Sequence, residues 1–93
     1  MIKSFKNLAA ESAWQRRFVK GVPNDILKVA NRKLTQIHNA RDLSDLRAPP
    51  GNRLEALSGN RQGQHSIRIN DQWRVCFEWR DGDAFEVEIV DYH

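Results

Sequence analysis

The stretch that decides the fold runs from His65 to His93 and reads HSIRINDQWRVCFEWRDGDAFEVEIVDYH. Apolar and polar residues alternate in three consecutive segments, which is the two-residue period of β-strands with one buried face. The apolar positions of the three segments are Ile67 and Ile69; Trp73, Val75, Phe77 and Trp79; and Phe85, Val87 and Ile89. We therefore predict three antiparallel strands joined by two hairpins.

The length of the second hairpin loop predicts how the last two strands pair. A three-residue loop at 81–83, which contains a glycine available for positive φ, aligns Trp79 with Phe85 and keeps the apolar faces together. A two-residue loop would instead place Phe85 beside Glu78 and lose that match. We expect the three-residue loop.

The first hairpin places two arginines across from each other on the polar face. A loop at 70–72 pairs Ile67 with Val75, and Arg68 then lies opposite Arg74. Like charges across a strand pair are unfavourable unless an anion lies between them, and two guanidiniums can hold a phosphate by bidentate hydrogen bonds. The same arginines could instead pair with glutamates of that face, so the pattern leaves both a phosphate site and an ordinary charged surface open.

The whole chain of 93 residues fits one domain, residues 1–93, with one modest core. It has no apolar run long enough to span a bilayer and no secretory signal pattern, so we expect a cytoplasmic protein with no membrane partner. The single Cys76 cannot form an internal disulfide, and no Cys/His cluster has metal-ligand spacing. We expect neither a metal nor another cofactor.

Charge is distributed unevenly along the chain. Residues 1–61 carry twelve Lys and Arg against five Asp and Glu, a net charge of +7, and residues 62–93 carry three against seven, a net charge of −4. The basic first part indicates a polyanion or an acidic protein as partner.

The first part of the chain has the patterns of a strand and two helices. Residues 1–6 are expected to form a short strand, and residues 11–20 a helix with Trp14 and Phe18 on one face. A second helix is expected to begin with Asn24 as its N-cap and to bury one stripe: Ile26, Val29, Ala30, Leu34 and Ile37. His38 is expected to cap the end of this helix.

A short helical turn at 41–47, a loop at 48–52 and a strand at 53–57 complete the expected order. The sequence therefore predicts an α+β fold, with two N-terminal helices packed on one face of an antiparallel sheet of four to five strands. The opposite face, which carries Arg68 and Arg74, would be open to a ligand.

Four segments closely resemble the HigB toxins, also called plasmid-maintenance killer proteins, of the RelE/ParE toxin superfamily: GNRQG at 59–63, SIRIN at 66–70, WRV at 73–75 and the terminal DYH at 91–93. The resemblance extends over essentially the whole chain and implies a RelE-like, microbial ribonuclease-like fold. It also implies a toxin of a type II toxin–antitoxin module that enters the A site of the 70S ribosome and cleaves mRNA without a metal. Its partner would be a HigA-like helix-turn-helix antitoxin, and operator DNA would be bound only through the complex of the two.

The resemblance also implies the residues of the site. Asp91, Tyr92 and His93 correspond to the active site of such toxins, and Arg68 and Arg74 to the arginines that bind the scissile phosphate. His93 would act as acid or base, and Tyr92 would stack on a base or bind the phosphate. Asp91 would orient His93 or be a coreward structural carboxylate. Contacts with RNA are expected from a basic set: Arg61, Arg16, Arg17, Lys20, Lys28, Arg32 and Lys33.

One departure from the family pattern concerns proton transfer. HigB toxins carry a His and a Lys where this chain has Glu55 and Ser58. Either the remaining residues suffice, or cleavage is slower, or Glu55 takes over proton transfer. Two other functions stay open, a ParE-like inhibitor of DNA gyrase and a weakly or non-catalytic member that acts through antitoxin binding and operon autoregulation.

Overall fold

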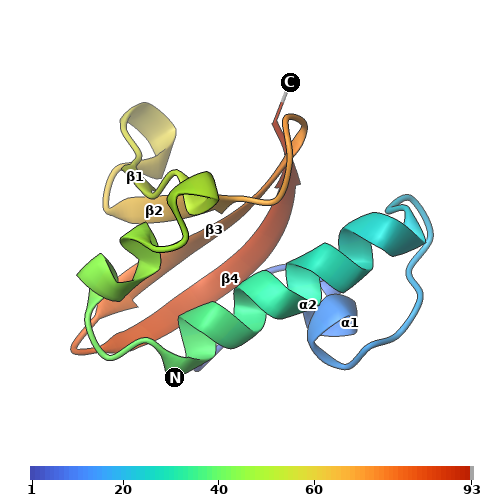
Figure 1. Cartoon of the computed structure of the whole chain (residues 1–93), viewed down its shortest axis with the longest axis horizontal. Coiled ribbons are helices and arrows are strands. Elements are labelled where there is room, and N and C mark those ends of the chain that lie inside the picture. The colour runs from blue at the N-terminus through green and yellow to red at the C-terminus, as the bar shows by residue number, and fades with distance from the viewer. Residues whose placement is uncertain (93) are drawn as a thin grey trace.

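The computed structural model describes residues 1–92, in which two helices lie against one four-stranded antiparallel sheet (Figure 1). The helices are α1 (Leu8–Trp14) and α2 (Asn24–Asn39). Short 3₁₀ helices follow as η1 (Leu43–Arg47), η2 (Pro50–Asn52) and η3 (Gly59–Arg61). The strands, in spatial order, are β1 (Glu55–Ala56), β2 (Gln64–Arg68), β3 (Trp73–Arg80) and β4 (Asp83–Asp91). The predicted α+β class with a four-stranded antiparallel sheet is confirmed.

The core lies between α2 and the inner face of the sheet. Ile67, Val75 and Val87 are fully buried on β2, β3 and β4. Helix α2 contributes one buried stripe: Ile26, Leu27, Ala30, Leu34 and Ile37. The predicted stripe is confirmed except at one position, because Leu27 is buried and Val29 is only half-buried. Within residues 1–92, neither helix has the length and apolar character needed to cross a membrane.

The first hairpin has the predicted register. Ile67 pairs with Val75, and Arg68 lies opposite Arg74. The Asn70 side-chain oxygen accepts two main-chain N–H groups of the loop, both at 2.8 Å. This Asx-type turn closes the loop and explains why Asn suits that position.

The second hairpin turn has two residues rather than the predicted three. Asp81 and Gly82 have φ angles of 51° and 81°, as a type I′ turn requires at both central positions. Phe85 consequently lies beside Glu78, the pairing that the sequence analysis rejected.

A β-bulge in β4 then restores the apolar match. Glu86 adopts a φ of 51°, and the register shifts so that Val75 again pairs with Ile89. The predicted register is therefore wrong at the turn and right beyond the bulge, because one extra residue in β4 offsets the shorter turn.

The N-terminal segment runs beside β4 but is not a strand of the sheet. It forms two isolated parallel bridges, at Ile2 with Ala84 and at Phe5 with Val87. The Ile2 N–H donates to His38 Nδ1 at 3.1 Å. His38 therefore anchors this segment, in addition to lying near the end of α2.

Helix α1 is shorter than predicted. It ends at Trp14, and Arg16 just beyond it has a φ of 60°. Phe18 is 71% exposed, so Trp14 and Phe18 do not share a helical face. Trp14 packs instead against His38, with 5.1 Å between ring centroids. Asn24 is the first residue of α2 and not its N-cap, which is Pro23.

Candidate active site

Arg74 occupies the sheet face opposite α2, and neighbouring groups hold its guanidinium in place. Nε donates to Ser66 Oγ at 2.8 Å, and Nη2 donates to the main-chain carbonyl of Arg53, also at 2.8 Å. Nη2 lies 3.9 Å from a carboxylate oxygen of Glu55, and the Arg74 side chain is only 12% exposed. These contacts preorganise a planar cation near the start of the inner strand β3.

Arg68 lies beside Arg74 on the neighbouring strand, as predicted. Its guanidinium pairs with the carboxylate of Asp71, whose side chain is almost fully exposed. The two arginines therefore have different carboxylate partners, Asp71 on the hairpin loop and Glu55 on β1. Their facing positions are compatible with an anion bound between them.

Lys33 adds positive charge near this edge of the sheet. Burial lowers the pKa of Lys33, and the charges of Arg32 and Arg68 lower it further. Its ammonium donates to Asn52 Oδ1 at 2.6 Å. The Lys33 side chain is half-buried, because this hydrogen bond draws it toward η2.

The end of β4 brings Tyr92 to the arginines. The Tyr92 ring centroid lies 5.7 Å from the Arg74 guanidinium carbon, a cation–π distance. Asp91 is exposed, and its Oδ2 accepts a hydrogen bond from Gln72 Nε2 at 3.2 Å. The coreward position considered for Asp91 is thus wrong. His93 lies outside the described residues.

Glu55 lies on the short strand β1, at the border of the arginine face. It pairs with Ser66 of β2, and its side chain is 51% exposed. A solvent-accessible carboxylate beside a phosphate-binding cation can accept a proton from a bound hydroxyl. The structure thus gathers Arg68, Arg74 and Tyr92 with Glu55 around one surface.

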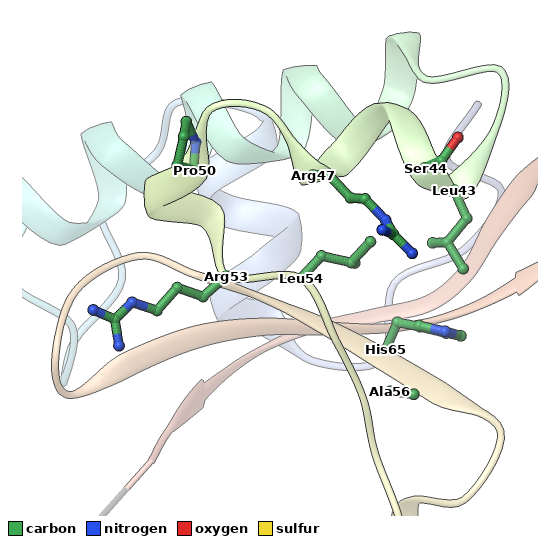
Figure 2. Close-up of a pocket in the computed structure, with 8 residues that line it drawn as sticks. All are labelled: Leu43, Ser44, Arg47, Pro50, Arg53, Leu54, Ala56 and His65. Carbon is green, nitrogen blue, oxygen red and sulfur yellow. The ribbon is translucent and has the colours of Figure 1, made fainter.

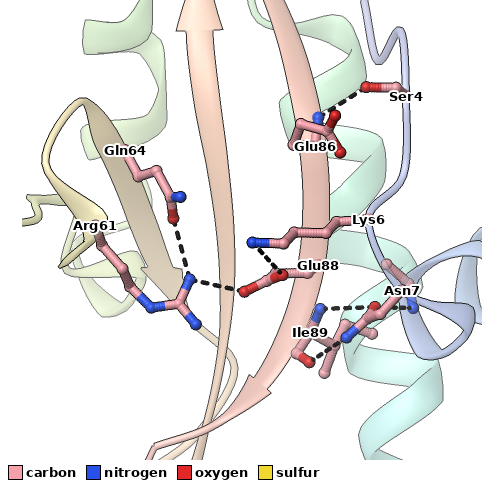
Figure 3. Close-up of polar contacts among 9 residues, drawn as sticks. Ser4, Lys6, Asn7, Arg61, Gln64, Glu86, Glu88 and Ile89 are labelled. Atoms are coloured by element: carbon pink, nitrogen blue, oxygen red, sulfur yellow. Dashed lines mark hydrogen bonds and ion pairs between the residues drawn. The ribbon is translucent and has the colours of Figure 1, made fainter.

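Arg61 has a different environment from the one predicted (Figure 3). Its Nη1 donates to Glu88 Oε1 at 2.7 Å and to Gln64 Oε1 at 3.1 Å. Lys6 Nζ lies 3.6 Å from the other Glu88 oxygen. The hydrogen bond to Glu88 raises the pKa of Arg61. Arg61 therefore ties η3 to β4, a role that the sequence pattern did not reveal.

Cys76 is fully buried on β3, near this pair. Burial raises the pKa of the Cys76 thiol, so the reactive thiolate is disfavoured at neutral pH.

The remaining predicted RNA-binding cations lie on the helical side. Phe18 and Leu27 contribute apolar surface to a groove of about 470 Å³. Four of the cations line this groove: Arg16, Arg17, Lys28 and Arg32. Lys20 is exposed but is not one of the lining residues. The structure therefore forms two basic regions, one on the sheet face and one at the start of α2.

Asn52 is a structural residue that the sequence analysis missed. It is fully buried, and its Nδ2 lies 2.9 Å from Gln36 Oε1 and 3.2 Å from the carbonyl oxygens of Leu46 and Ala48. These contacts hold η1 and η2 against α2 and so position the residues that enter β1. A Pro-Pro-Gly-Asn segment is typical of an exposed turn, and it carried no signal of this burial.

Comparisons with known proteins identify the family. A family model described as "RelE-like toxin of type II toxin-antitoxin system HigB" matches residues 3–93. The chain belongs to this HigB-like toxin family. As a member of a type II toxin–antitoxin family, it has an antitoxin as its partner.

Individual relatives agree with this assignment. The chain is 32% identical to "Endoribonuclease HigB" of Proteus vulgaris over the full length of both proteins. It is 49% identical to "Toxin HigB-1" of Vibrio cholerae over 63 residues, which cover 68% of this chain and 66% of that relative. The match thus spans slightly less than two thirds of the Vibrio protein.

A solved structure shares the fold of this toxin. The "YoeB-YefM complex from Staphylococcus aureus" contains a chain that superposes with a TM-score of 0.59 and 18% sequence identity. The match covers 100% of this chain and 98% of that one. At this level of identity, the similarity supports the fold alone.

Proposed function

We propose that this toxin is an mRNA endoribonuclease that works in the A site of the ribosome and thereby stops translation. The observation that carries the proposal is the preorganised Arg74, which faces Arg68 and lies beside Tyr92 and Glu55 on one open sheet face. The Proteus relative that aligns over its full length is named an endoribonuclease, which supports the proposal.

The chemistry that fits this surface is attack of a ribose 2′-hydroxyl on the adjacent phosphate. The O2′ loses its proton, the O2′–P bond forms, the P–O5′ bond breaks, and O5′ gains a proton. Arg68 and Arg74 would offset the charge that develops on the phosphoryl oxygens. This step leaves a 2′,3′-cyclic phosphate on the upstream fragment.

Proton transfer needs two further groups. Glu55 would take the 2′-hydroxyl proton, because its exposed carboxylate borders the arginine face. His93 would protonate the leaving oxygen, and Asp91 would orient it. Tyr92 would stack on a nucleobase next to the cut.

The basic residues on the helical side would bind ribosomal RNA without reading its sequence. The proposed partners are therefore the 70S ribosome, mRNA and a HigA-like helix-turn-helix antitoxin, which would carry the complex to operator DNA. We propose a cytoplasmic location and a RelE-like, microbial ribonuclease-like fold.

The mechanism is tested with mRNAs that differ at one atom. An mRNA with a single 2′-deoxynucleotide upstream of the mapped cut is compared with the unmodified mRNA on the same programmed ribosomes. We expect cleavage of the unmodified mRNA only, with a cyclic phosphate at the new 3′ end. Equal cleavage of both would contradict attack by the 2′-hydroxyl.

Gyrase inhibition is the alternative function with the least support. The family match is to HigB toxins, and the arginine face suits a phosphate. A supercoiling assay with purified gyrase checks this alternative, and we expect no inhibition.

A further inference from the structure

A cavity of about 500 Å³ lies where η1, η2 and the residues that enter β1 approach β2 (Figure 2). It is lined by two cations, Arg47 and Arg53, and by apolar side chains that include Pro50 and Leu54. His65 of β2 also lines it, on the inner side of the sheet, where its ring stacks on Phe77 with 6.4 Å between centroids.

The His65 ring has a polar atom without a partner. Its Nδ1 is the one buried side-chain nitrogen or oxygen in residues 1–92 that makes no hydrogen bond. Buried polar atoms in native proteins are almost always paired, so an unpaired one beside a cavity is open to a further hydrogen-bonding group.

The cations of the cavity are also available for a ligand. Neither the Arg47 nor the Arg53 side chain makes a hydrogen bond or an ion pair with another residue in the described part of the chain. Figure 2 shows Arg47 reaching from η1 toward Leu54, with His65 projecting from β2 and Arg53 at the opposite end. The unpaired Arg47 guanidinium beside Leu54 suits an anion that carries a flat apolar part.

The cavity is connected to the candidate active site. The main-chain carbonyl of Arg53 accepts a hydrogen bond from Arg74, and Glu55 follows Arg53 by two residues. Strand β1 has only two residues and forms the edge of the sheet, so an RNA strand on the arginine face can pass around it.

We propose that this cavity binds a nucleotide of the mRNA next to the scissile phosphate. Arg47 holds its phosphate, Leu54 covers its base, and His65 Nδ1 bonds a polar edge of that base. This subsite rests on the proposed endoribonuclease function and would give the toxin a nucleotide preference beside its cut. An acidic peptide is the competing ligand, because its carboxylates would also pair with Arg47.

Binding is tested on the purified full-length toxin with the four ribonucleoside 5′-monophosphates and with inorganic phosphate. Long-range ¹H–¹⁵N spectra follow the His65 ring during each titration. We expect at least one mononucleotide to shift the His65 Nδ1 resonance and to bind at least tenfold more weakly to Arg47→Gln. The control is Arg41→Gln, which removes the same charge from an exposed residue outside the cavity and should bind like wild type.

Three results would overturn the subsite. They are no mononucleotide binding, equal binding by both variants, or shifts of His65 produced as strongly by phosphate alone or by an acidic peptide. The amide spectrum of each variant shows whether it is folded, and Arg47 is exposed, so we expect both to fold.

Sequencing of cleaved mRNA ends tests whether the cavity affects the nucleotide preference of cleavage. We expect Arg47→Gln to cut on ribosomes with an altered preference for the flanking nucleotide, while Arg41→Gln keeps the wild-type preference. An unchanged preference in a variant that still cleaves would overturn the subsite and leave the proposed function standing. A wild-type protein that binds mononucleotides but does not cleave would contradict the proposed function instead.

Discussion

The Arg74 guanidinium donates to the main-chain carbonyl of Arg53 at 2.8 Å, across 21 residues of sequence. This bond joins the start of β3 to the turn that precedes β1. Because Glu55 follows that turn, the same contact sets the position of the carboxylate relative to the arginine. This hydrogen bond therefore links two parts of the candidate site that are far apart in the sequence.

Replacement of Arg74 by Lys tests whether the planar cation matters. Lysine keeps the charge but cannot hold Ser66, Arg53 and a phosphate at once. We expect single-turnover cleavage on ribosomes to slow by about 10²–10³-fold, as for loss of one transition-state donor. The control is Arg80→Lys at the exposed end of the same strand, which should cleave normally. A loss of less than threefold for Arg74→Lys would remove Arg74 from the mechanism.

Glu55→Gln tests the proposed base. The amide keeps the shape of the side chain but cannot accept the hydroxyl proton, so we expect cleavage to slow by about 10²–10⁴-fold. Stability should change by less than about 1 kcal/mol, because the Glu55–Arg74 pair is half-exposed and 3.9 Å long. Glu78→Gln on β3 is the matched control. Normal cleavage by Glu55→Gln would show that Glu55 is not the base and would leave His93 as the candidate.

The sequence predicted the first hairpin because burial of one strand face specifies register. A shift by one residue would have moved Ile67 and Val75 out of the core. The prediction failed at the second turn. A two-residue turn plus a bulge at Glu86 buries the same apolar residues as a three-residue turn. Two solutions that bury the same residues cannot be separated by pattern alone.

The positions of the candidate site residues could be predicted where these residues lie on paired strands. Arg68 and Arg74 follow from register, whereas the contact of Arg61 with Glu88 joins residues 27 apart in the sequence. The burial of Asn52 depends on η1 and η2 folding back onto α2. Such contacts arise only from the tertiary fold, so periodicity could not reveal them.

The Arg61–Glu88 pair should stabilise the fold. Arg61→Met leaves a carboxylate that is only 9% exposed with Lys6 as its remaining cation. We expect the free energy of unfolding in urea to fall by about 2 kcal/mol, less than for a fully buried pair because Arg61 is 31% exposed. Adding Glu88→Gln to Arg61→Met should restore part of the loss. If the double variant is less stable than Arg61→Met, the buried charge is not the cause.

The basic groove on the helical side should govern the salt dependence of ribosome binding. Lys28→Glu combined with Arg32→Glu removes two contacts with phosphates, so the slope of log affinity against log salt should fall in magnitude by about 2. Sedimentation with 70S ribosomes at several salt concentrations measures it. Arg41→Glu combined with Arg80→Glu changes the net charge equally elsewhere. Equal effects of the two pairs would show that net charge, not this groove, drives binding.

The central claim is tested most directly by primer extension on a defined mRNA in a purified translation system. Wild-type toxin is compared with the chain that lacks His93, each with and without ribosomes. We predict cuts in the A-site codon for wild type only when ribosomes are present, and none when His93 is deleted. Intact mRNA at high concentrations of wild-type toxin on programmed ribosomes would contradict the account.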